Sequence, residues 1–173
     1  MRTAVAIPVE EYLRTEYDPD VDCVDGELIE RNIAEREHGQ WQGAIYVWFY
    51  QRQRKTEIFP FLEQRIQITP TRFRVPDICL VLGAVPKEGI FTSAPFVTIE
   101  ILSPEDRMTR VQNRIDDFLS IGVSYIWAIN PESRTAWIHT KDGSVTVRDG
   151  ILRTANPEIV LDLNEIYLEI DSL

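Results

Sequence analysis

Two acidic residues stand inside apolar segments that otherwise have the character of buried strands. Asp77 follows Pro76 in RFRVPDICLVLG (72–83), and Glu100 lies among branched residues in FVTIEILS (96–103). A carboxylate in an apolar strand is costly without a partner, and a proline removes a ladder hydrogen bond. The connection between the segments is long enough for them to pair side by side, which would bring both carboxylates to one end of a sheet.

Such a pair of carboxylates would repel at short distance unless one is protonated or a cation lies between them. Oxygen ligands of this kind suit Mg²⁺ or Mn²⁺, and the backbone carbonyl of Ile101 could add a further oxygen. A structural role is the alternative, in which each carboxylate caps a loop or forms an ion pair with an arginine. Arg74 and Arg114 are candidates for such pairs, and the residues alone leave both interpretations open.

The segment after Glu100 has helical periodicity, and we expect a helix over residues 104–122. Apolar residues spaced three or four positions apart should face the core: Met108, Val111, Ile115 and Phe118. A parallel stripe is basic: Arg107, Arg110 and Arg114. This stripe would run along the rim of the carboxylate site, where a phosphate would bind. The alternative is a solvated charged face shared with Glu105 and Asp117.

The remaining segments predict an α/β (α+β) fold in which a mixed β-sheet is flanked by helices. An N-terminal hairpin should turn at Asp25-Gly26. The other expected elements are a short helix within 7–18, a long helix over 35–56, a strand within 60–69, strands at 72–83, 96–103, 123–130, 134–140 and 144–150, and a short strand or loop followed by a small helix in 159–173.

The composition is that of an ordinary globular protein, with 44% hydrophobic residues, 27% charged residues and a net charge of −10. We expect one domain over residues 1–173. No apolar run approaches the length of a membrane span, and the start MRTAVAIPVEEYL lacks the long apolar region of a secretory signal. We therefore expect a cytoplasmic protein without a membrane partner. The acidic balance argues against unspecific adhesion to nucleic acids as the main activity, but leaves a local basic cleft open.

The two cysteines, Cys23 and Cys79, form no CxxC motif, so the sequence predicts neither a thiolate metal site nor a disulfide framework. We expect both to be inert, Cys79 as a small core residue. His139 is expected to be structural. Trp137 alternates with polar residues in a strand that we place at a sheet edge, where it would contribute to a homodimer.

The ordered set of motifs resembles the Uma-two family of endonucleases, in the PD-(D/E)XK restriction-endonuclease-like superfamily. The resemblance covers about residues 20–165. The matching residues are Asp25-Gly26 in the hairpin, His38 at the start of a helix, Pro76-Asp77, the run Glu100-Ile101-Leu102-Ser103-Pro104, Gly122-Val123 and Trp127. Each motif is weak by itself, but their order along the chain is fairly specific.

The resemblance implies that Asp77 and Glu100 bind Mg²⁺ (or Mn²⁺) and that the chain cleaves phosphodiester bonds of nucleic acid, which we expect to be DNA. The superfamily often dimerises to cut two strands. The superfamily's lysine, two residues after the glutamate, is Leu102 here. The family's substitute lysine on the next helix corresponds to Arg114, a phosphate clamp but a poor base.

Two further departures are Asn130, where the family has aspartate, and Phe118, where it has tyrosine. Together the departures put turnover in question. We therefore keep three hypotheses: a metal-dependent endonuclease, a catalytically degenerate nuclease-fold binding protein, and a hydrolase of another substrate on the same fold.

His38 is expected at the site as a proton carrier or phosphate donor, with a structural role at the helix start as the alternative. Glu27 and Glu63 are candidates for additional acidic ligands, with a surface position as the alternative for each.

Overall fold

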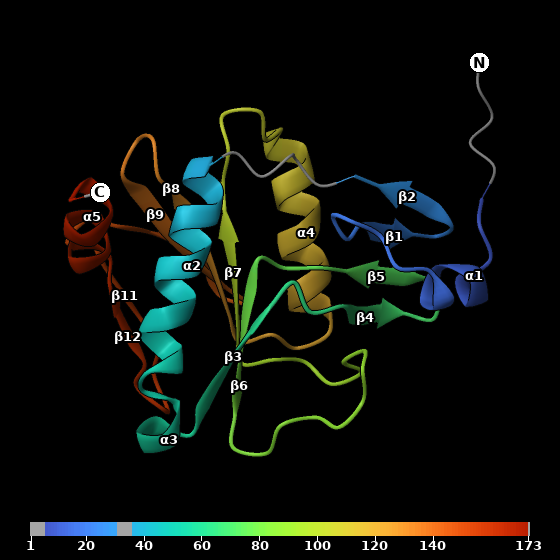
Figure 1. Ribbon diagram of the computed structural model, residues 1–173, viewed down its shortest axis with the longest axis horizontal. Helices are drawn as coiled ribbons and strands as arrows, with labels where there is room; N and C mark the ends of the chain where they lie inside the picture. The colour runs from blue at the N-terminus through green and yellow to red at the C-terminus, as the bar shows by residue number, and fades with distance from the viewer. Residues whose placement is uncertain (1–5, 31–35, 173) are drawn as a thin grey trace.

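The computed structural model describes residues 6–30 and 36–172. A large mixed sheet has the strand order β10-β9-β8-β7-β6-β3, and a small sheet has the order β2-β1-β5-β4 (Figure 1). The strands of the large sheet are β3 (Ile58–Leu62), β6 (Ile78–Leu82), β7 (Val97–Ile101), β8 (Tyr125–Asn130), β9 (Thr135–Thr140) and β10 (Gly143–Val147). Those of the small sheet are β1 (Asp22–Val24), β2 (Glu27–Ile29), β4 (Ile66–Thr69) and β5 (Arg72–Arg74).

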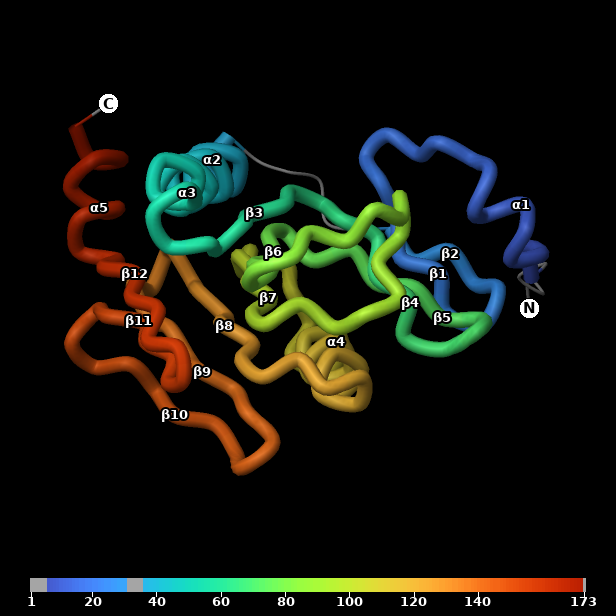
Figure 2. The backbone as a smooth tube through the Cα atoms, turned by 90° about the horizontal axis from the view of Figure 1, so that it is seen from below, coloured from blue at the N-terminus to red at the C-terminus, as the bar shows by residue number. Residues whose placement is uncertain are grey.

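Helices cover both faces of the large sheet. The helices are α1 (Val9–Arg14), α2 (Arg36–Tyr50), α3 (Gln53–Thr56), α4 (Met108–Ser120) and α5 (Leu163–Asp171). A separate two-stranded ribbon consists of β11 (Ile151–Arg153) and β12 (Val160–Asp162). Figure 2 shows α2 and α4 on opposite sides of the large sheet, with α1 and the small sheet at one end of the molecule. The expected α/β (α+β) fold with an N-terminal hairpin is therefore confirmed.

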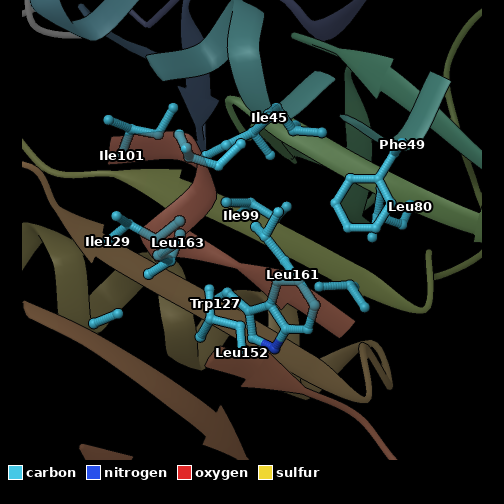
Figure 3. Close-up of a cluster of buried hydrophobic side chains, with 14 of the residues drawn as sticks. Ile45, Phe49, Leu80, Ile99, Ile101, Trp127, Ile129, Leu152, Leu161 and Leu163 are labelled. Carbon is cyan, nitrogen blue, oxygen red and sulfur yellow. The ribbon is translucent and has the colours of Figure 1, made fainter. Parts of the chain in front are cut away.

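The apolar periodicity of α2 explains one of the two core layers. Trp41, Ile45 and Phe49 are buried and join a cluster with residues of the sheet such as Ile99 and Trp127. Figure 3 shows Ile45 and Phe49 of this cluster together with Ile99 and Trp127. Because a central strand is covered on both faces, all five residues of β7 are buried, which accounts for its nearly continuous apolar sequence.

The second core layer lies under α4, where Val111, Ile115 and Phe118 pack in one cluster with Cys79 and Ile126. Three predictions for this helix are wrong. The helix begins at Met108 instead of residue 104. Met108, which was expected in the core, lies in the first turn and is 70% exposed. Arg107 precedes the helix in extended conformation, so the three arginines do not form a continuous helical stripe.

The segment 72–83 is not one strand, contrary to the prediction. It forms β5 and β6, which belong to different sheets, and the link Val75–Asp77 joins them. Pro76 has no N–H to give to a ladder, so a break at this point is physically favoured. The predicted strand within 60–69 is divided in the same way into β3 and β4, with Glu63 between them at φ 48°.

The structure also differs from the predictions in the end of the long helix and in the position of β9 within its sheet. The long helix expected over 35–56 stops at Tyr50 and resumes as α3, and its first residue lies outside the described residues. The strand of Trp137, β9, pairs with β8 on one side and β10 on the other, so the edge position predicted for it is wrong. None of the described helices has the length and apolar character needed to cross a membrane.

Candidate active site

Asp77 and Glu100 lie at one end of two neighbouring antiparallel strands. The register of β6 with β7 ends where Ile78 lies opposite Ile99. Asp77 directly precedes β6, and Glu100 follows Ile99 in β7. Both residues are buried and line one pocket of about 170 Å³.

The carboxylate of Asp77 is held against the backbone of β7. Its Oδ2 accepts a hydrogen bond of 2.7 Å from the N–H of Ile101, which belongs to the peptide unit that follows Glu100. Its Oδ1 lies 3.3 Å from Nε2 of His38. The backbone carbonyl of Asp77 accepts a hydrogen bond of 3.0 Å from the side chain of Gln42. The start of α2 therefore contributes side chains to the same site, as the sequence predicts for His38.

Glu100 forms an ion pair with Arg114. The nitrogen Nη2 lies 2.9 Å from each oxygen of Glu100, and Nε lies 3.1 Å from Oε2. Helix α4 directs the side chain of Arg114 toward Glu100, because Val111 and Ile115 on the same helix are packed into the core and fix its orientation. Of the alternatives for Glu100, the pair with an arginine is present in the structure.

Arg114 has two further partners outside the predicted site. Its Nη1 binds the carboxylate of Asp22, and its Nη2 donates a hydrogen bond of 2.9 Å to the carbonyl of Val75. Burial acts to lower the pKa of Arg114, but the carboxylates of Asp22 and Glu100 outweigh it and raise that pKa above its ordinary value. The guanidinium thus stays charged.

A chain of alternating charges continues from Asp22 to the hairpin turn. Arg74 binds Asp22 at 2.9 Å and Asp117 at 2.6 Å. Arg72 extends the chain, at 2.9 Å from Asp117 and 2.5 Å from Asp25. This network connects Glu100 with the small sheet through residues of β1, β5 and α4.

Sequence reasoning did not assign Asp22 to the site. Its strand is only three residues long, and its turn at Asp25-Gly26 gives it the pattern of a surface hairpin. A signal was present, because Asp22 stands between the apolar residues Val21 and Cys23, and all three are buried. An acid between buried residues needs a cationic partner, and Arg74 stands in a similar setting beside Phe73.

The rim of the pocket is acidic. Exposed acidic residues line it at Glu30, Glu37, Glu63, Glu105 and Glu132, and Asp106 is half-buried. Of the three arginines expected along the rim, Arg110 lines the pocket as an exposed cation and Arg114 lines it as well, whereas Arg107 is not part of the lining. Glu27 is exposed on β2 and is not part of this lining. Among residues 6–30 and 36–172, no group of three or more His, Cys, Asp or Glu side chains could hold a metal ion.

The departures from the family pattern have definite positions. Leu102 is buried in the cluster under α4, and its N–H donates to the carbonyl of Ile129 at 2.7 Å. Asn130 caps the next turn through a 3.0 Å hydrogen bond from the N–H of Ser133. Phe118 is a core residue. The cation that reaches Glu100 comes from α4 through Arg114 and not from the position of Leu102.

The mixed sheet between helices, with two acids at the end of neighbouring central strands, defines a restriction-endonuclease-like fold. A family model, Uma2, described as "Putative restriction endonuclease", matches residues 9–169, so the chain belongs to this family. A solved structure described as a "putative nuclease belonging to DUF820" from Anabaena variabilis ATCC 29413 is similar, with a TM-score of 0.78 and 23% sequence identity. The match covers 94% of this chain and 98% of that chain. A search among curated proteins gave no match.

Proposed function

We propose that this protein is a metal-dependent endonuclease that hydrolyses phosphodiester bonds of nucleic acid. The observation that carries the proposal is that Asp77 and Glu100 line one pocket, with the Asp77 carboxylate bound to the N–H of Ile101, the residue after Glu100. Membership of a family of restriction endonucleases supports the same reaction class.

The donor set fits a hard divalent cation. Asp77 and Glu100 supply carboxylate oxygens, and the carbonyl of Ile101 is the third oxygen that we assign. Mg²⁺ commonly binds one or two protein carboxylates, keeps several waters and takes further oxygens from the substrate phosphate, so a site without a third acid suits it. We therefore assign Mg²⁺, or Mn²⁺, to these residues.

The ion, when bound, supplies Lewis-acid stabilisation of phosphate oxygens and a more acidic water. The roles of the chain's own groups follow from their contacts. Arg114 orients Glu100 and remains charged, so its positive charge attracts the phosphate of a substrate. His38, within 3.3 Å of Asp77, can carry a proton at the wall of the pocket.

We propose DNA as the substrate. A homodimer as the active form is proposed from the family resemblance alone, because Trp137 does not lie in an edge strand. The acidic rim of the pocket repels phosphates, so binding of nucleic acid should depend on the divalent cation. Binding to a labelled duplex should accordingly be strong with Ca²⁺, which supports binding without fast cleavage, and weak with EDTA.

The test compares cleavage of supercoiled plasmid by the wild type with that by Asp77→Ala and Asp77→Asn in Mg²⁺ or Mn²⁺. We expect both variants to lose at least a hundredfold in rate, since each removes a carboxylate charge. Glu158→Gln, which neutralises an exposed acid that is not part of the pocket lining, is the matched control and should cleave within twofold of the wild type. A structured RNA transcript, assayed in parallel, separates the two substrates.

A nuclease-fold binding protein without turnover is the second candidate, and the ion pair of Arg114 with Glu100 favours it. A permanent cation on the glutamate competes with a metal ion for the same oxygens. Calorimetric titration with Mn²⁺ separates the candidates. One equivalent bound by the wild type and lost in Asp77→Asn supports the nuclease, whereas no binding by the wild type supports the second candidate.

A further inference from the structure

We propose that Asp22 is the positioning residue of this site. It fixes both Arg114, which holds Glu100, and the link Val75–Asp77, which carries Asp77. The inference rests on the proposed function, because it concerns the residues assigned to metal and phosphate. It adds a residue from the small sheet to a site otherwise formed by the large sheet and its helices.

The contacts of Asp22 form a closed ring with Val75 and Arg114. Oδ1 of Asp22 accepts a hydrogen bond of 2.8 Å from the N–H of Val75. The carbonyl of Val75 accepts from Nη2 of Arg114 at 2.9 Å, and Nη1 of Arg114 binds Oδ2 of Asp22. The N–H and the carbonyl of Val75, two residues before Asp77, are therefore both hydrogen-bonded.

This ring connects the two strand-borne acids. On one side, Nη2 of Arg114 continues to the carboxylate of Glu100. On the other side, Pro76 has no N–H, so Val75 supplies the hydrogen-bonding groups that hold the link ahead of Asp77. A change at Asp22 would therefore displace both acids, although it lies on another sheet.

The burial of Asp22 argues that its place is specific. The residue is 2% exposed and binds two arginines, Arg114 and Arg74, besides the N–H of Val75. A buried carboxylate is retained only where its partners satisfy it. Without the negative charge of Asp22, the positive charges of Arg114 and Arg74 beside the pocket would be less well neutralised. The excess positive charge would repel a divalent cation.

The experiment compares variants of Asp22 with matched variants of Asp117. Asp117 is a second buried acid of the same network, but its carboxylate binds Arg74 and Arg72 instead. Asp22→Asn and Asp117→Asn each remove one negative charge at nearly constant shape. Asp22→Ala and Asp117→Ala in addition remove the side-chain acceptors.

Two readouts are measured, neither of which is activity. By calorimetry, we expect the Kd for Mn²⁺ to rise at least tenfold in Asp22→Asn and to stay within twofold in Asp117→Asn. By hydrogen exchange without metal, peptides that cover 72–82 and 96–104 should exchange faster in Asp22→Ala than in Asp117→Ala when both are compared at equal global stability. If Asp22→Ala does not fold, the two Asn variants carry the exchange comparison.

The outcomes separate the inference from the proposed function. Equal effects of the Asp22 and Asp117 variants on both readouts would overturn the positioning role and reduce Asp22 to general stability. Absence of Mn²⁺ binding in the wild type would overturn the proposed function, and the metal-free exchange data would still decide whether Asp22 holds the two segments.

Discussion

Nη2 of Arg114 lies 2.9 Å from each carboxylate oxygen of Glu100, and Nε of the same guanidinium lies 3.1 Å from Oε2. Because the same guanidinium also binds Asp22 and the carbonyl of Val75, its position is determined by three separate segments of the chain. The cation at the site is thus a fixed part of the fold, and its chemical identity should influence turnover strongly.

The first prediction concerns Arg114→Lys. Arginine stays protonated, whereas a buried lysine can release its proton, and the family resemblance places a lysine at this position. We expect plasmid cleavage in Mg²⁺ to increase at least threefold. The thermal midpoint should fall by several degrees, because lysine cannot reproduce the planar set of contacts. Arg110→Lys, an exposed exchange on the same helix, should change neither value, and a cleavage rate at or below that of the wild type would contradict the prediction for Arg114.

The buried charge network predicts a large loss of stability in Arg74→Ala. Its removal leaves Asp22 and Asp117 buried with fewer partners, and breaking a buried pair typically lowers the free energy of unfolding by about 3–5 kcal/mol. The exposed pair of Arg134 and Asp171 supplies the control, since Asp171→Asn should change the free energy of unfolding by less than about 1 kcal/mol. Urea denaturation measures the free energy of unfolding of each variant. Similar losses in the two variants would show that the buried network stabilises the fold no more than an exposed ion pair does.

The pH dependence of stability should contain a contribution from His139. Burial lowers the pKa of His139 below its ordinary value of 6.5, so the unfolded chain takes up a proton at a higher pH than the folded chain does. Stability from this source is therefore present above pH 6.5 and is lost as the pH falls toward the folded pKa. His139→Gln should show a smaller loss of unfolding free energy between pH 7 and pH 5 than the wild type. Parallel curves for the two proteins would contradict this.

The cysteines should be inert to thiol reagents in the folded protein. Burial raises the pKa of Cys79 to about 12 and also raises the pKa of Cys23. Both cysteines are free and buried, so little of either thiol is ionised and a reagent reaches the sulfur atoms poorly. At pH 8 we expect no reaction with Ellman's reagent in native protein and two equivalents in guanidinium chloride. Rapid labelling of either residue without denaturant would mean that its segment opens readily.

Most elements could be predicted where the periodic residues and the turn residues that bound them lie within one short segment of sequence. The hairpin at Asp25-Gly26 could be foreseen because both turn residues need positive φ, which they adopt at 53° and 89°. Strands 125–130, 135–140 and 143–147 carry clear alternation or apolar runs between turn residues. The helix α4 was foreseen, but its start was not, because Pro104 resembles the first residue of a helix.

The division of 72–83 between two sheets could not be read from the pattern. Val75 is buried, so the apolar run continues through the break, and only Pro76 signals it. The assignment of Asp77, Glu100, Arg114 and His38 to one region was possible because each has an unusual setting or a motif. The link from Arg114 to Asp22 depends on a contact between distant segments, which local periodicity does not reveal.

The pairing of β1 with β5, in which Cys23 lies opposite Phe73, closes a long loop of chain. Closing such a loop costs conformational entropy before its contacts form, so we expect this docking to follow the assembly of neighbouring hairpins. A chain in which only β6, β7 and β8 have formed has Glu100 in a strand and Asp77 beside one, but Asp22 does not yet bind Val75 and Arg114. The alignment of the two acids is thereby tied to the completion of folding, and partly folded molecules would carry both acids without it.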